Sequence, residues 1–190
     1  LLYYSIKTAL SSKFNSDVVV SSDDDEILAY ARIFGAIPYK RSEELGGDEI
    51  TLDPVIFDAY KYMSKEFVYD YVITMQTTSP ILKKESLDEA ITLMLYKKLD
   101  TVISATDDTH LMWEDRHGIF VPLYEKRLNR QFLPKTLKET GGFLICRSKI
   151  LSKNTRIGKE VELFKLNHGE EIDIDTYEDW AICESLMKRK

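Results

Sequence analysis

The strongest constraint on the fold of this chain is a repeated alternation of helix and strand patterns over residues 1–105. Apolar side chains recur at helical spacing, and short β-branched or apolar runs that end in polar residues indicate strands between the helices. Strand patterns lie at 17–22, 36–39, 71–76 and 101–105, and helix patterns lie at 1–10, 23–35, 53–63 and 86–95. Such alternation predicts an α/β fold with helices packed on a mostly parallel sheet.

Three of the predicted helix starts carry capping signals. A side chain that accepts hydrogen bonds from the first free amides of a helix stabilises that end, and proline suits the first turn. The signals are Asp53 followed by Pro54, Ser86 with Glu89, and Thr176 with Asp179. We therefore expect helices to begin at these positions.

Residues 107–135 interrupt the alternation. This segment holds Trp113, two histidines and many charges without a regular apolar period, and strand patterns return only at 142–146 and 161–166. So long an irregular stretch inside a domain is usually an insertion with its own role. We predict a single domain over residues 1–190 that carries an insertion at about 107–135.

Charge and apolar content exclude several functional classes. The chain has 26 basic and 32 acidic side chains and a net charge of −6, which argues against broad nucleic-acid binding. The hydrophobic content of 44% is typical of a globular domain, and the apolar runs are too short to span a bilayer. Cys146 and Cys183 lack CxxC spacing, which indicates two reduced, buried thiols in a cytoplasmic protein.

Polar clusters follow three of the predicted strands. Ligands of open α/β sheets bind beyond the carboxyl ends of the strands, so these clusters are the first candidates for a binding site. They are Ser21-Ser22-Asp23, Gln76-Thr77-Thr78-Ser79-Pro80 and Asp173-Ile174-Asp175.

The last cluster alternates carboxylates with isoleucines. In a strand at 172–175, Asp173 and Asp175 would project from one face while the isoleucines enter the core. Neighbouring carboxylates repel each other, and Mg²⁺ held by one or two carboxylates plus substrate phosphates would relieve that repulsion. A solvated edge strand has the same alternation, so spacing alone leaves both interpretations open.

The other candidates also have ordinary structural explanations. Asp23 opens a run of acids that would by itself stabilise a helix N-terminus. The loop at 76–80 suits hydrogen bonding to a sugar, or is a plain polar turn. Arg130 beside Gln131 suits a bidentate carboxylate, or lies on the solvated surface. The three histidines match no metal-binding spacing.

Six motifs cover nearly the whole chain in a fixed order. They are Leu-x-Tyr-Ser-Ile at 2–6, Val-Val-Ser-Ser-Asp at 19–23, Arg-x-x-Glu-Leu-x-x-Asp at 41–48, Gln-x-Thr-Ser-Pro at 76–80, Arg-Gln-x-Leu-Pro at 130–134 and Asp-Ile-Asp-Thr-x-Glu-Asp at 173–179. In this order they resemble the CMP-sialic acid synthetases (acylneuraminate cytidylyltransferases). The fourth and fifth motifs carry most of the specificity.

The resemblance implies a Rossmann-like, three-layer nucleotidyltransferase fold in which the 107–135 segment is a dimerisation insertion. The implied reaction transfers CMP from CTP to the anomeric hydroxyl of a sialic (nonulosonic) acid and releases pyrophosphate. Legionaminic, pseudaminic or Kdo acid is an alternative substrate, and a non-catalytic dimeric relative is an alternative of another class. A homodimer that binds neither nucleic acid nor membrane is expected.

The resemblance also implies roles for single residues. Asp173 and Asp175 would be the catalytic carboxylates that hold Mg²⁺ against the triphosphate. The other implied contacts are to the nucleotide, at Arg41 and Asp23, and to the sugar acid, at Gln76, Thr78, Ser79, Arg130 and Gln131.

The chain departs from the family pattern in two places. The family begins with a strand and a glycine- and lysine-containing phosphate loop upstream of the position that matches Leu1, so weak CTP binding is expected of the chain as given. After Asp48, residues 49–52 read Glu-Ile-Thr-Leu where the family has small residues and serines facing the nucleotide.

Overall fold

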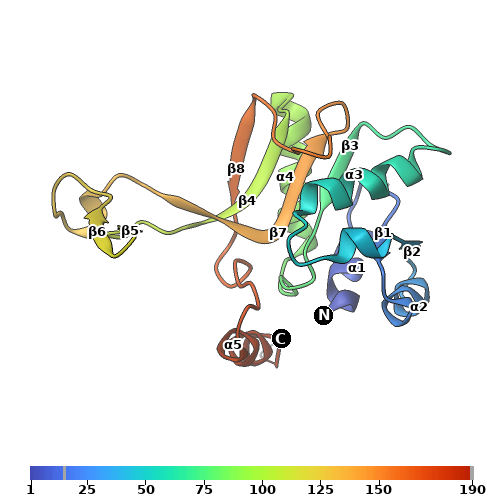
Figure 1. Cartoon of the computed structure of the whole chain (residues 1–190), viewed down its shortest axis with the longest axis horizontal. Coiled ribbons are helices and arrows are strands. Elements are labelled where there is room, and N and C mark those ends of the chain that lie inside the picture. Colours follow the sequence, from blue (N-terminus) through green and yellow to red (C-terminus); the bar gives the residue numbers. More distant parts are fainter. Residues whose placement is uncertain (15, 189–190) are drawn as a thin grey trace.

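A four-stranded sheet forms the centre of the molecule (Figure 1). The computed structural model describes residues 1–14 and 16–188. β7 runs antiparallel to both of its neighbours, whereas the other three strands share one direction. The sheet is therefore mixed but mostly parallel, as the alternation predicts. Its order is β3 (Tyr71–Thr74), β7 (Leu137–Arg147), β4 (Thr101–Asp107) and β8 (Val161–Lys165).

A second, two-stranded sheet is formed by β1 (Val19–Ser22) and β2 (Ile37–Lys40), which are parallel. Helix α1 (Leu2–Leu10) precedes β1, and α2 (Asp25–Ile33) connects the two strands. Side chains of both helices and of the turn before β2 form a small core of Ile6, Ala31 and Ala36. Pro38 fits in β2, because this strand pairs with β1 alone in the part of the chain that the structure describes.

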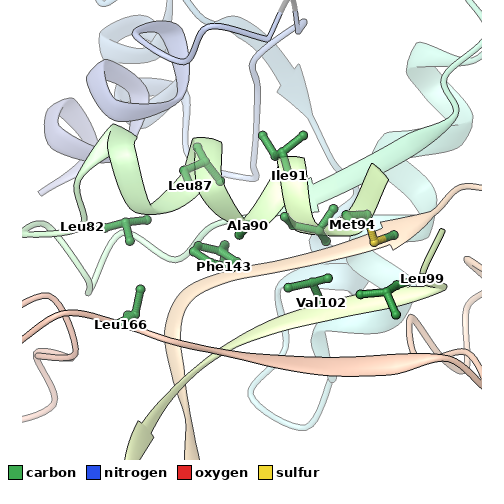
Figure 2. Close-up of a cluster of buried hydrophobic side chains, with 10 residues drawn as sticks. Leu82, Leu87, Ala90, Ile91, Met94, Leu99, Val102, Phe143 and Leu166 are labelled. Atoms are coloured by element: carbon green, nitrogen blue, oxygen red, sulfur yellow. The ribbon is translucent and has the colours of Figure 1, made fainter. Parts of the chain in front are cut away.

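The main core lies between α4 (Lys84–Lys97) and the four-stranded sheet. Figure 2 shows Leu87, Ala90 and Met94 on α4 directed towards Val102 and Phe143 on the strands. Each of the larger side chains, leucine, methionine, valine or phenylalanine, contributes about 1.5–3 kcal/mol when it is removed from water. The helical spacing of apolar residues therefore correctly predicts which face of α4 is buried.

Two of the three capping predictions are wrong. Helix α4 begins after Lys83, so Ser86 lies inside its first turn, where it accepts a hydrogen bond from Asn167 Nδ2 at 3.2 Å. Helix α3 (Leu52–Met63) begins after Thr51, and Asp53 instead forms an ion pair with Arg156 at 2.6 Å. In both cases a partner distant in sequence binds the side chain that would otherwise cap the helix.

The third capping prediction is confirmed. Asp179 N donates to Thr176 Oγ1 at 3.2 Å, and the hydroxyl donates to Asp179 Oδ2 at 2.7 Å, at the start of α5 (Tyr177–Lys188). This reciprocal pair satisfies free amides at the helix end. It also determines the course of the chain directly after Asp175.

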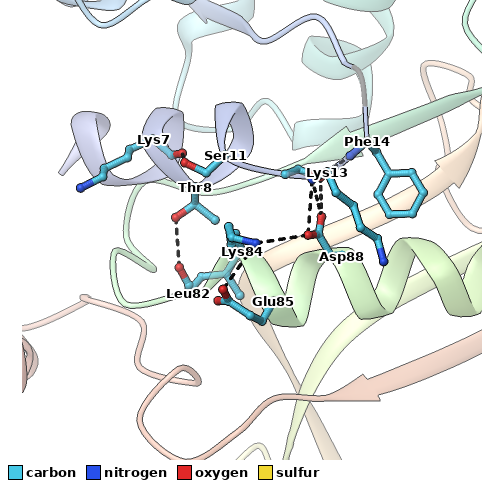
Figure 3. A network of polar contacts seen from close by, with 10 residues as sticks. Lys7, Thr8, Ser11, Lys13, Phe14, Leu82, Lys84, Glu85 and Asp88 are labelled. Atoms are coloured by element: carbon cyan, nitrogen blue, oxygen red, sulfur yellow. Dashed lines mark hydrogen bonds and ion pairs between the residues drawn. The ribbon is translucent and has the colours of Figure 1, made fainter.

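Helix α1 and the residues directly after it are attached by polar contacts to α4 and to the segment before α4, as Figure 3 shows. Ser12 Oγ donates to Asp88 Oδ1 at 2.5 Å, and Thr8 Oγ1 donates to the Leu82 carbonyl at 3.1 Å. Lys84 Nζ lies 3.7 Å from the other carboxylate oxygen of Asp88. Because Asp88 is buried, these contacts replace the water that its charge would otherwise require.

A cavity of about 970 Å³ separates the two sheets. Apolar side chains of β1 and β3 line it, together with side chains of α1, α3 and α4. Tyr69 Oη donates to Asp17 Oδ2 at 2.6 Å and joins the segments that lead into β3 and β1. The two strands therefore begin at the same end of the cavity, but they are not hydrogen-bonded to each other.

The predicted insertion extends away from the sheet (Figure 1). It contains a hairpin of β5 (Trp113–Arg116) and β6 (Ile119–Pro122), joined at His117 and Gly118, which both have positive φ as a tight hairpin turn requires. Short 3₁₀ helices lie at Glu43–Gly46 and, on the return from the hairpin, at Arg130–Phe132. Within residues 1–14 and 16–188 we find no helix with the length and apolar content needed to cross a membrane.

Candidate active site

The loop that follows β3 brings together several of the predicted site residues. Gln76 N donates to the Gly141 carbonyl on β7 at 3.1 Å, which extends the β3–β7 pairing into the loop. The Thr78 carbonyl accepts from Ile174 N at 2.9 Å, which attaches the loop to the segment before α5. As a result Gln76, Ser79 and Asp173 lie around one point, although nearly 100 positions separate the first from the last.

That point lies over Gly141. A Cβ atom added to Gly141 would lie 2.9 Å from each of Gln76 Oε1, Ser79 Oγ and Asp173 Oδ2. We call these three side chains the oxygen cluster. Sequence reasoning missed Gly141, and the only available signal was a pair of glycines inside a strand, which often marks a bulge or a close approach.

Two oxygens of the cluster residues have no hydrogen-bond partner in the part of the chain that the structure describes. Ser79 is 4% exposed, and its Oγ makes no hydrogen bond within the described residues. Asp173 Oδ1 is likewise buried and unpartnered there. Since buried polar atoms are nearly always satisfied, these atoms mark a place that a ligand, an ion or water would occupy.

The prediction of a strand at 172–175 is wrong. The segment is a loop between β8 and α5, because Ile174 bonds to Thr78 and the amide of Asp175 donates to Asp179 Oδ2 at 3.3 Å. The argument that alternation directs both carboxylates to one face therefore fails. Asp173 is half-buried at the cluster, and Asp175 is exposed one residue beyond Ile174.

Asp173 and Asp175 are the residues that could hold a metal ion. No group of three or more His, Cys, Asp or Glu side chains is gathered for a metal among residues 1–14 and 16–188. A cation held by one or two carboxylates and by substrate phosphates needs no such group. The unpartnered Asp173 Oδ1 fits a site of this kind.

The predicted nucleotide residues form a separate pair at the end of β1. Arg41 Nη2 donates to Asp23 Oδ1 at 2.7 Å, and Nη1 donates to the Ser21 carbonyl at 3.2 Å. Its Nε is buried and has no acceptor among the described residues. Asp24, not Asp23, caps α2 by accepting from the amides of Glu26 and Ile27, so the capping explanation does not apply to Asp23.

Arg130 and Gln131 lie at the base of the hairpin. They line a cavity of about 370 Å³ with Asp107, Thr109 and Lys135, and the Arg130 side chain is 62% exposed. Hydrogen bonds from Thr109 lower the pKa of Asp107 to about 2, with a further contribution from Lys165. Arg130 Nη2 lies 4.0 Å from Asp107 Oδ1, and this ion pair directs the side chain to Asp107 and not to the oxygen cluster.

Comparison with known proteins decides the family. A family model described as cytidylyltransferase matches residues 1–132, which is well over half of the chain. The chain belongs to the cytidylyltransferase family. It is therefore a nucleotidyltransferase, as the ordered motifs predict.

The sequences of several cytidylyltransferases align with almost the whole of this chain. A pseudaminic acid cytidylyltransferase of Campylobacter jejuni is 28% identical over 205 residues, which span 99% of this chain and 85% of the relative. A CMP-N,N'-diacetyllegionaminic acid synthase of Legionella pneumophila is 25% identical, with the same two coverages. An N-acylneuraminate cytidylyltransferase of Danio rerio is also 25% identical, over all of this chain and 45% of its own length.

Solved structures confirm the fold. A CMP:2-keto-3-deoxy-manno-octonic acid synthetase complexed with CTP superposes with a TM-score of 0.69 at 14% identity, over 99% of this chain and 87% of that one. A 4-diphosphocytidyl-2C-methyl-D-erythritol synthase superposes with a TM-score of 0.72 at 12% identity, over 98% and 87%. The predicted Rossmann-like nucleotidyltransferase fold is thus confirmed.

Proposed function

We propose that this cytidylyltransferase transfers CMP from CTP to the anomeric hydroxyl of a nonulosonic acid, forming CMP-N-acetylneuraminate or a close analogue and releasing pyrophosphate. The observation that carries the proposal is the oxygen cluster, which places Gln76 and Ser79 of the Gln-x-Thr-Ser-Pro motif beside Asp173. Sugar hydroxyls need hydrogen-bond acceptors of this kind, and a reacting hydroxyl must be held next to the site of phosphate chemistry. Relatives named for three different nonulosonic acids support the same substrate class.

One set of residues would bind the sugar acid, and another set would bind the nucleotide. Gln76, Thr78 and Ser79 would bind and orient the sugar acid, and Arg130 with Gln131 would pair with its carboxylate. The last assignment requires the hairpin base to approach the cluster when substrate binds, since Arg130 now faces Asp107. Arg41, held by Asp23, would provide positive charge and its free Nε to the nucleotide.

Mg²⁺ is the proposed cofactor, held by Asp173 and Asp175. When bound there it would neutralise charge on the triphosphate. The support for this assignment is the buried, unpartnered Asp173 Oδ1 together with the exposed carboxylate of Asp175 in the same loop.

A homodimer in the cytoplasm is also part of the proposal. The hairpin of β5 and β6 exposes Trp113, Ile119 and Phe120 away from the sheet, as a surface that pairs with a second copy would. Both cysteines are buried thiols, which suits a reducing compartment.

A panel of sugar acids tests the proposed activity. The purified chain is incubated with CTP, Mg²⁺ and, separately, N-acetylneuraminate, pseudaminic, legionaminic and Kdo acid, and pyrophosphate is measured. We expect release with at least one of the four, and the preferred sugar identifies the substrate. No release with any of them overturns the proposal.

A melting experiment separates the enzyme from a non-catalytic relative. Ligand that binds only the folded state adds about 2.7 kcal/mol at 100 times its Kd, so saturating CTP should raise the Tm of a competent enzyme. An unchanged Tm with saturating CTP would favour the non-catalytic module.

A further inference from the structure

Gly141 lies in an irregular part of β7 whose shape is determined by Ser104. The register of β7 against β4 shifts between Ile103 and Ala105. Ser104 is fully buried, and its Oγ accepts from Phe143 N at 2.9 Å and from Thr140 Oγ1 at 2.8 Å. These bonds hold the strand on both sides of the two glycines, so Gly141 cannot easily move away from its neighbours.

The two glycines face different surroundings. A Cβ on Gly142 would meet Ser104 Oγ at 3.2 Å and Leu166 Cδ1 at 3.3 Å, which are packing contacts of the core. A Cβ on Gly141 would meet three polar side-chain atoms, all at 2.9 Å and all from residues of the candidate site. A real Cβ essentially never has such contacts, so an added methyl group must displace the oxygen cluster.

The arrangement of the oxygen cluster depends on the absence of a side chain at Gly141. Its three oxygens approach the same point over Gly141, so any two of them lie no farther apart than twice 2.9 Å. Two of them accept hydrogen bonds only, and the third belongs to the buried Ser79 hydroxyl without a protein partner in the described chain. Together they form a single acceptor surface that suits one donating group, such as a hydroxyl, on their open side.

We propose that Gly141 is a positioning residue for the sugar acid. By having no side chain, it lets Gln76, Ser79 and Asp173 converge into one acceptor site for a substrate hydroxyl. The inference rests on the proposed function and extends it, because it connects the sugar-binding loop and the proposed metal carboxylate at a residue to which no role has been assigned. Its effect is transmitted through the three side chains, since Gly141 itself offers the substrate no polar side chain.

Gly141→Ala tests this role, with Gly142→Ala as the matched control on the next residue. In Gly141→Ala we expect the KM for the sugar acid to rise about 10-fold or more, because the displaced oxygens would no longer accept hydrogen bonds together from the substrate hydroxyl. The KM for CTP should rise less than the KM for the sugar acid, since Arg41 and Asp23 lie in a different part of the site and CTP would depend on the cluster only through Asp173. Gly142→Ala should lower the Tm without a selective effect on the sugar acid.

Several results would overturn the inference. An unchanged KM for the sugar acid in folded Gly141→Ala would do so, and so would equal increases for the two substrates. If Gly141→Ala does not fold, the variant Gly141→Ala/Gln76→Ala/Ser79→Ala/Asp173→Ala removes all three oxygens that the methyl group would meet and should recover a folded protein. Failure of that recovery would show that crowding of the cluster is not the cause.

A readout that needs no activity separates this inference from the proposed function. The side-chain amide resonances of Gln76 should shift in Gly141→Ala and remain in place in Gly142→Ala. A wild-type chain that is inactive with all four sugar acids overturns the proposed function, whereas an active wild type with unmoved Gln76 resonances in Gly141→Ala overturns the positioning role alone.

Discussion

Two carboxylates of the molecule illustrate how local surroundings determine what a residue can do. Asp107 receives hydrogen bonds from Thr109 and lies 3.5 Å from Lys165 Nζ, and these contacts stabilise its charged form. Asp175 is exposed and offers its carboxylate to solvent, while its backbone amide is bound by Asp179. The first residue should therefore contribute to stability, and the second should be available for chemistry.

Replacing Asp175 by alanine should abolish turnover and leave the fold intact. The side chain is exposed, so its loss removes no packing, whereas it removes one of the two proposed Mg²⁺ ligands. Pyrophosphate release and Tm are the two measurements. Glu184→Ala, an exposed acid on α5, is the control and should retain full activity. Activity in Asp175→Ala would contradict the metal assignment.

The stability contributed by Asp107 should depend on pH. Its pKa of about 2 in the folded chain lies below the value of about 3.9 in an unfolded one, so its contribution is fully present above pH 4. The contribution is lost as the pH falls through about 2, because the folded state then binds the proton as well. Asp107→Asn should lower the urea midpoint at pH 7.

The difference between wild type and Asp107→Asn should shrink between pH 4 and pH 2. Equal differences at pH 7 and pH 3 would show that the charged contacts of Asp107 do not stabilise the folded state.

At the scale of elements, β1 and β3 each have one paired edge within residues 1–14 and 16–188. Ile37 N bonds to the Val18 carbonyl and Arg41 N bonds to the Ser22 carbonyl, so the even-numbered residues of β1 face β2. Gln76 N and the Asp70 carbonyl bond to the β7 side, so the even-numbered residues of β3 face β7. By the twofold alternation of a strand, the odd-numbered amides of both strands face the cavity between the sheets.

Hydrogen exchange should detect this alternation. The amides of Val19 and Ile73 should exchange faster than those of the adjacent Val20 and Val72, because only the latter pair face a neighbouring strand. The adjacent residues are internal controls, since they share burial and local sequence. Equal protection of both sets would show that a further strand or a second chain covers the open edges.

At the scale of the whole molecule, the hairpin of β5 and β6 has no core of its own. It extends from the sheet (Figure 1). Trp113, Ile119 and Phe120 are among its exposed apolar side chains. A two-stranded hairpin by itself is marginally stable in water, so contact with a second copy would stabilise it. This observation supports the proposed dimer.

A charged substitution on the hairpin should change the oligomeric state. Ile119→Asp with Phe120→Asp should convert a dimer into a monomer of about 22 kDa in sedimentation, because two buried carboxylates would oppose the interface. Glu114→Gln on the same hairpin is the control and should leave the dimer unchanged. A wild-type monomer at all concentrations would contradict the proposed dimer.

The sequence alone determined the order of helices and strands over residues 1–105, the buried cysteines and the family. These features depend on local periodicity or on ordered motifs, which can be read without knowing what lies nearby in space. Local signals failed where a residue distant in sequence bound the side chain or the backbone amide on which the prediction relied. Arg156 binds Asp53, Asn167 binds Ser86, and Thr78 binds the Ile174 amide in place of a strand partner.

Only the tertiary structure decided how the site is assembled. Motif order identified Gln76, Ser79 and Asp173 as candidates, but nothing in their spacing indicates that their oxygens meet over Gly141. That meeting depends on the hydrogen bonds of Ser104 at the register shift between β4 and β7, and on the bond between Ile174 and Thr78. Both join segments far apart in the chain. A position that functions by lacking a side chain has no pattern of its own, because the space that it leaves is defined only by its neighbours in the fold.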